Sequence, residues 1–248
     1  MSVQLGVTHV LRTLLVVTLM ATTGPPTQAQ GYEQLEKWCH DDNATDDQTI
    51  QGCSAVISSG RESGEKLSRV YYDRGTALFN KDQLDPAIED FDEAIRLDPT
   101  DPDTFNNRGN AHNNEKDYDL ALKDFDQALK LKPDFAYAFN NRGIVYDNLG
   151  QTSRAVEDYD RAIALDPNFG DAFNNRGIAN LNLGRPDAAL ADFDNALRVD
   201  PKKASSLFGR GVARRRLGDT AGGDADIAAA KAIRADVTEG MAEAGVRP

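Results

Sequence analysis

Apolar residues recur along the middle of the chain at helical spacing. In residues 119–131 the apolar positions are Leu120, Ala121, Phe125, Ala128 and Leu129, which fall on one stripe of a helix. Residues 103–115 form a second helical stretch immediately before this one. The pattern therefore predicts a helical hairpin over residues 103–131.

The same hairpin pattern occurs five times at a spacing of 34 residues. Each copy has a glycine in its first helix, with an aromatic residue or leucine four positions earlier and an alanine nineteen positions later. A proline follows the second helix in four of the copies. The five glycines are Gly75, Gly109, Gly143, Gly177 and Gly211. Self-similarity at this period predicts a stack of equivalent units rather than one globular core.

These columns resemble the tetratricopeptide repeat. The resemblance implies an all-α fold, a right-handed α-solenoid of helix-turn-helix repeats at residues 68–101, 102–135, 136–169, 170–203 and 204–237. We expect each glycine to let its helix approach a small residue of the second helix almost backbone to backbone. These small residues follow the glycines by twelve positions and are Ala87, Ala121, Ala155, Ala189 and Gly223. The second helices should begin at polar N-cap residues, namely Asp85, Asp119, Ser153 and Asp187.

Arginine and aspartate form two further columns. An arginine precedes each repeat glycine, and an aspartate always follows that arginine by 16 residues. The arginines are Arg74, Arg108, Arg142, Arg176 and Arg210, and the aspartates are Asp90, Asp124, Asp158, Asp192 and Asp226. We predict a ladder of ion pairs within or between hairpins. The alternative is an anion-binding stripe, which a paired arginine would not provide.

The two ends of the chain do not follow the repeat. Residues 1–29 combine Arg12, an apolar stretch and small residues before Gln30, which predicts a signal peptide cleaved near Ala29. The alternative, a membrane anchor, would need a longer apolar run, of about 20 residues. We therefore expect no stable membrane insertion after cleavage, and a periplasmic or secreted protein. Residues 238–248 should be a flexible tail.

An exported chain is exposed to oxidising conditions. Its two cysteines, Cys39 and Cys53, should therefore form a disulfide, which would stabilise the fold by about 3 kcal/mol. Residues 30–67 would form a helical N-terminal cap held by that bond, with helices at 32–38 and 47–58 and a loop at 60–66.

Asparagine columns are the candidate binding residues. In the resembled family, the second asparagine of each F-N-N-R-G faces the concave groove, as in the O-linked N-acetylglucosamine transferases, where amides grip the main chain of a bound peptide. An amide both donates and accepts, so it can pair with main-chain groups. Two neighbouring columns would make this face rich in amides. The candidates are Asn106, Asn107, Asn114, Asn140, Asn141, Asn148, Asn174, Asn175 and Asn182. Two alternatives remain: a merely solvated face, or residues copied by duplication.

The sequence gives little support for nucleic-acid binding, catalysis or metal binding. The net charge of −12 disfavours binding to nucleic acid. No nucleophile has a base at a meaningful spacing, and phosphate-loop and metal motifs are missing from the sequence, so we expect neither an enzyme nor a cofactor or bound metal. The acidic turn 41–47 lacks an EF-hand pattern, and the basic cluster 214–216 suits a helix C-terminus as well as an acidic ligand.

The sequence thus predicts an adaptor that holds an extended segment of an envelope or secreted protein in its groove. The alternative is a structural scaffold or self-assembling solenoid without a peptide ligand.

Overall fold

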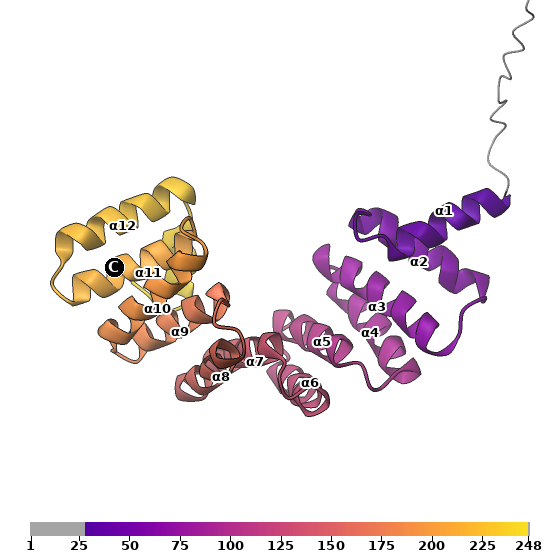
Figure 1. Cartoon of the computed structure of the whole chain (residues 1–248), viewed down its shortest axis with the longest axis horizontal. Coiled ribbons are helices and arrows are strands. Elements are labelled where there is room, and N and C mark those ends of the chain that lie inside the picture. Colours follow the sequence, from indigo (N-terminus) through magenta and orange to yellow (C-terminus); the bar gives the residue numbers. More distant parts are fainter. Residues whose placement is uncertain (1–27, 248) are drawn as a thin grey trace, which may run out of the picture.

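Helices stack along an arc in the computed structural model, which describes residues 28–247 (Figure 1). Within these residues all regular structure is helical, so the chain is an all-α helical-repeat solenoid. Ten helices form five hairpins, each with a first and a second helix. The hairpins are α3 (Gly64–Asn80) with α4 (Leu84–Leu97), α5 (Pro102–Asn114) with α6 (Tyr118–Leu131), α7 (Ala136–Asn148) with α8 (Thr152–Leu165), α9 (Gly170–Asn182) with α10 (Pro186–Val199), and α11 (Ala204–Arg216) with α12 (Thr220–Ile233).

Large side chains of the second helices fill the core between the two helices of each hairpin. Phe91, Phe125, Tyr159 and Phe193 are at most 1% exposed. Each ring lies against the repeat glycine of its own first helix: a Cβ at Gly143 would come within 2.6 Å of the Tyr159 ring. In these four hairpins the aromatic ring, rather than the small residue expected from the sequence, lies nearest to the position of the missing Cβ. Only Gly211 meets backbone, at the carbonyl oxygen of Gly223.

The turn inside each hairpin contains one residue with positive φ. It is a glycine in three hairpins, while Asp82 and Lys116 adopt φ values of 58° and 66° in the other two. Because this turn is tight, the second helices begin earlier than the sequence predicted. Their N-cap residues are Gln83, Asp117, Gln151, Arg185 and Asp219. The expected caps at Asp85, Asp119, Ser153 and Asp187 were wrong, since these residues lie inside the first turn.

Arginine side chains connect neighbouring hairpins. Arg142 donates from Nε and Nη2 to the two carboxylate oxygens of Asp158 in its own hairpin, at 2.8 and 2.7 Å, and from Nη1 to Asp126 of the preceding hairpin at 2.6 Å. The ladder is thus confirmed both within and between hairpins. Equivalent pairs within hairpins are Arg74–Asp90, Arg108–Asp124, Arg176–Asp192 and Arg210–Asp226, and those between hairpins are Arg108–Asp92, Arg176–Asp160 and Arg210–Asp194.

The N-terminal helices α1 (Gln28–His40) and α2 (Asp46–Ser59) pack on α3 and carry the disulfide between Cys39 and Cys53. The disulfide is buried against Val70. Arg74, which has no preceding repeat aspartate, instead donates to Ser54 in α2 at 3.1 Å. The loop expected at 60–66 is shorter, because α3 already begins at Gly64. The signal-peptide prediction falls mostly on residues 1–27, outside the described part of the chain.

The C-terminal residues are not a flexible tail, contrary to the sequence expectation. Val237–Glu243 forms helix α13, and Val237, Met241 and Val246 are at most 2% exposed. These side chains join the apolar cluster of the last two hairpins, which supplies the burial that the isolated segment lacks.

Removing one arginine bridge should destabilise the stack. Arg142→Gln leaves the carboxylate of Asp158, only 7% exposed, without its cation. Breaking such a buried pair costs about 3 kcal/mol of unfolding free energy, measurable by urea denaturation. The control Arg96→Gln breaks an exposed pair with Glu93, and should change stability by under about 0.5 kcal/mol. Equal effects of the two substitutions would contradict this role of the bridge.

Candidate functional site

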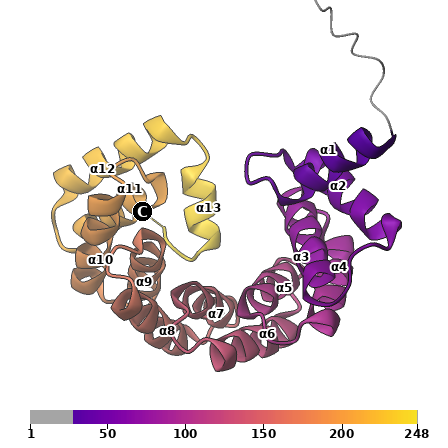
Figure 2. The same cartoon turned by 45° about the vertical axis from the view of Figure 1, so that its right-hand side comes forward.

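The first helices of the hairpins line the inner side of the arc. Cα atoms of helices α3, α5, α7, α9 and α11 approach within 8 Å from each of these helices to the next, whereas those of the second helices α4, α6, α8, α10 and α12 do not. A stack whose first helices are closer together must curve toward them, and Figure 2 shows α5, α7 and α9 inside α6, α8 and α10. This concave face is the candidate site, and all the asparagine columns lie on its helices.

The two asparagines of each F-N-N-R-G form a continuous chain of hydrogen bonds, here called the amide relay. Each first asparagine donates to its own neighbour: Asn106 to Asn107, Asn140 to Asn141, and Asn174 to Asn175, at 3.2 to 3.3 Å. Each second asparagine then donates to the preceding hairpin: Asn175 to Asn140 at 3.0 Å, and Asn141 to Asn106 at 3.1 Å. The relay therefore joins α5, α7 and α9.

Hydroxyl groups terminate the relay at both ends. Asn107 donates to the Tyr72 hydroxyl at 3.1 Å, and Ser206 donates to Asn174 at 2.8 Å. Neither residue was among the candidates predicted from the sequence. Tyr72 could have been found, because it occupies the first-asparagine column one repeat earlier. Ser206 lies outside that column and gave no comparable signal.

The two asparagine columns of the relay differ in burial. Asn106, Asn140 and Asn174 are only 5–7% exposed, so the expectation that they belong to an open inner surface is wrong. A buried amide must be hydrogen-bonded, and the adjoining hairpin provides the partner. Asn107, Asn141 and Asn175 are half-buried. Asn141 uses one N–H and accepts one bond in the relay, so by its chemistry it has a second N–H and a further lone pair for a ligand.

The third asparagine column is exposed at the ends of the first helices. Asn148 donates to Asn113 of the preceding first helix, α5, at 3.1 Å, and Asn182 donates to the main-chain oxygen of Ala244 at 2.9 Å. Asn114 is exposed at the end of α5. The structure brings Asn148, Asn175 and Asn182 together around one cavity.

This cavity has a volume of about 320 Å³ and mixed lining. Ile144 and Ile178 contribute apolar surface, and the carboxylate of Asp147 lies beside the Tyr159 hydroxyl, which donates to it at 3.0 Å. Burial raises the pKa of Asp147, and burial also raises that of Tyr159, with the nearby Asp147 charge adding to it. Because isoleucine side chains lie beside asparagines in its lining, the cavity can accept an apolar group bordered by amides.

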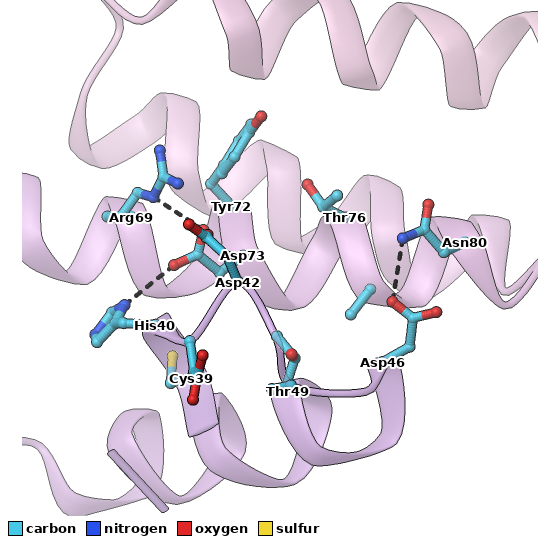
Figure 3. Close-up of a pocket in the computed structure, with 13 residues that line it drawn as sticks. Cys39, His40, Asp42, Asp46, Thr49, Arg69, Tyr72, Asp73, Thr76 and Asn80 are labelled. Carbon is cyan, nitrogen blue, oxygen red and sulfur yellow. Dashed lines mark hydrogen bonds and ion pairs between the residues drawn. The ribbon is translucent and has the colours of Figure 1, made fainter. Parts of the chain in front are cut away.

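A second cavity of about 480 Å³ lies at the N-terminal end of the concave face, between the cap and α3 (Figure 3). Asp73 replaces the second asparagine of the repeat here. Its carboxylate contacts His40 at 3.1 Å and Arg69 at 2.9 Å, while burial raises its pKa. Across the cavity Asn80 donates to Asp46 at 3.1 Å. The side chains therefore already pair with one another.

Two groups of side chains in the described residues have the types and proximity of metal ligands. Cys39 lies near His40 and Asp73, but its sulfur is in the disulfide. His112, Glu115 and Asp117 converge near the end of α5.

The arginines of the basic cluster 214–216 each have a partner: Arg214 pairs with Asp226, Arg215 with Asp224, and Arg216 donates to the Leu181 carbonyl. This supports the structural interpretation of the cluster.

Asp147 should make stability depend on pH. Because its pKa is raised on folding, the folded state holds this proton more tightly than the unfolded state, and unfolding free energy falls as pH rises from about 4 through the folded pKa. Asp147→Asn keeps an acceptor for Tyr159 but lacks this loss. Its stability relative to wild type should therefore increase between about pH 3.5 and 7 in urea denaturation. The exposed control Asp134→Asn should follow wild type, and parallel curves for Asp147→Asn would refute the assignment.

Solved structures with the same helical stack are similar to the chain. MamA from Desulfovibrio magneticus RS-1 is 20% identical, with a TM-score of 0.60, over 71% of this chain and 98% of that one. The structure titled "YrrB: a TPR protein with an unusual peptide-binding site" is 22% identical, with a TM-score of 0.57, over 79% and 100%. TTC0263, a thermophilic TPR protein from Thermus thermophilus, is 18% identical, with a TM-score of 0.59, over 71% and 98%. These likenesses establish the fold.

Sequence comparison adds independent evidence on the family. No curated protein matches the chain significantly. As a separate finding, none of the described helices is long and apolar enough to cross a membrane. Two family models of the tetratricopeptide repeat match residues 109–174 and 170–203. A third family model, described as a TPR repeat, matches residues 75–115. The matches and the helical stack together identify the chain as a tetratricopeptide repeat protein.

Proposed function

We propose that this protein is an exported adaptor that holds an extended segment of another protein against the concave face of α5, α7 and α9. The observation that carries the proposal is the half-buried column of Asn107, Asn141 and Asn175. Their amides are fixed by the relay in three successive hairpins. Asn141 and Asn175 each keep an N–H and a lone pair beyond the relay, whereas Asn107, which also donates to Thr76, keeps a lone pair.

The spacing of the hairpins suits an extended ligand. Packed helices lie about 8 to 10 Å apart, and three residues of an extended chain span about 10 Å. One amide per hairpin can therefore meet a main-chain group at every third residue of a ligand. Because main-chain groups are common to all sequences, side-chain preference would come from elsewhere, and Ile144 and Ile178 supply apolar surface beside Asn175.

Relatives in fold support a binding role. Tetratricopeptide repeat proteins are generally interaction scaffolds rather than enzymes, and the YrrB title names a peptide-binding site. The absence of a recognised catalytic motif in the sequence agrees with that role. A purely structural scaffold or self-assembling solenoid is the alternative, and the experiment below distinguishes it.

Export rests on two features of the chain. Residues 1–29 have the composition of a signal peptide, and the buried bond between Cys39 and Cys53 suits an oxidising compartment. We propose a periplasmic or secreted location, and hence an envelope or secreted protein as the partner. The net charge of −12 fits a basic partner better than nucleic acid.

The proposal can be tested by capture from envelope extract. The mature chain and the triple variant Asn107→Ala, Asn141→Ala, Asn175→Ala would serve as paired baits. We expect the variant to lose proteins that the wild type retains. The broken relay also removes hydrogen bonds worth about 1 kcal/mol each, so thermal melting must show that both baits are folded at the temperature of capture.

A second pair of baits separates binding from stability. Asn114→Ala with Asn148→Ala alters exposed groove amides outside the relay, and Asn168→Ala with Asn195→Ala alters amides away from the first helices. Weaker capture by the first pair alone would support the groove. Equal capture by all baits, or no specific capture, would favour the scaffold alternative.

A further inference from the structure

The C-terminal segment 237–247 lies on the concave face at its C-terminal end. After α12 the chain turns back, and α13 contacts α11 inside the arc (Figure 2). Met241 and Val246 are 2% and 0% exposed. They belong to the same apolar cluster as Leu181 of α9 and Val212 of α11. The segment is therefore packed on the inner helices, where a ligand of the groove would lie.

A groove amide binds the main chain of this segment. Asn182, the last member of the exposed asparagine column, donates to the Ala244 carbonyl oxygen at 2.9 Å. The next residue, Gly245, has a φ of +82°, and a Cβ there would come within 2.9 Å of the Asn182 side-chain oxygen. Small residues at 244 and 245 thus allow the backbone to approach the amide closely.

The residues of the segment that pack on α9 and α11 follow a simple pattern. Two aliphatic anchors, Met241 and Val246, are separated by five positions and enclose the Ala244–Gly245 pair. The Val246 N–H donates to the Met241 carbonyl oxygen at 2.8 Å, so the end of α13 folds back and presents both anchors to the same surface. This is a C-terminal helix turn of the kind that glycine favours.

The open part of the groove begins where the segment ends. Glu243 and Ala244 form one wall of the cavity of about 320 Å³ that Asn148 and Asn175 also line. An extended ligand that followed the amides from α5 toward α9 would meet the segment at Asn182. The segment and such a ligand would compete for this amide.

We infer that the concave face of α9 and α11 is a docking site for a helix end with two aliphatic anchors around a small-residue pair. Residues 237–247 occupy it in cis and restrict the ligand to the part of the groove before Asn182. The competition with a ligand rests on the proposed function, whereas the docking of the segment does not.

The test uses the whole mature chain and a labelled synthetic peptide with the sequence of residues 236–248. Gly245→Ala should release the segment, because the new Cβ meets Asn182 and the backbone has positive φ. The matched control is Gly240→Ala, whose Cβ would meet only Arg234, at 3.5 Å. Fluorescence anisotropy should show the peptide binding at least about tenfold more tightly to Gly245→Ala than to wild type, because release raises the vacant fraction of the site. Gly240→Ala should bind it no more tightly than wild type.

Hydrogen exchange in residues 237–247 reports whether the segment has been released. If Gly245→Ala retains wild-type protection, Met241→Asp supplies the release by placing a charge at a buried anchor. A released segment with no gain in peptide binding would overturn the docking site. That outcome leaves the capture of foreign proteins by the central groove unaffected, so the two proposals fail separately.

Discussion

Each repeat arginine holds carboxylates from two hairpins at once, and the alignment of the stack depends on this bridge. The guanidinium of Arg142 is planar and presents donors in a fixed fork. Two of its nitrogens pair with Asp158 and the third with Asp126 of the preceding hairpin. The bridge therefore links the fold of one hairpin to the position of the one before it. It also places cations beside the aspartates of an acidic chain, where they offset the repulsion.

The amide relay on the inner side depends on this alignment. A hydrogen bond between Asn141 and Asn106 forms only when α7 and α5 have the register that the bridges maintain. The buried asparagines provide structural hydrogen bonds, while their half-buried neighbours border the open face. The relay thus both stabilises the stack and lines the groove. Changes in the stability of the stack would therefore also change the shape of the groove. The groove has different ends: paired charges around Asp73 at one, and the chain's own segment at Asn182 at the other.

Much of this arrangement could be predicted from the sequence because it repeats. Five copies of the same columns predicted the hairpins and the arginine–aspartate pairs, and the cysteine pair predicted the disulfide. Features that depend on contacts between neighbouring helices were harder to predict from the sequence. The burial of Asn106 and the contact of Gly143 with Tyr159 are set by how adjacent helices pack, which one column cannot show. The C-terminal segment occurs once, so no periodicity indicated that its few apolar residues would be buried. Export and the count of five family repeats remain predictions.

In the proposed function, the half-buried amides of the relay bind the ligand. Nuclear magnetic resonance of asparagine side-chain NH₂ groups, in the mature chain with and without a segment of a captured partner, tests it most directly. We expect shifted resonances for Asn107, Asn141 and Asn175, and unchanged ones for Asn168 and Asn195, which lie away from the first helices. Binding that leaves the three groove amides unchanged would contradict it.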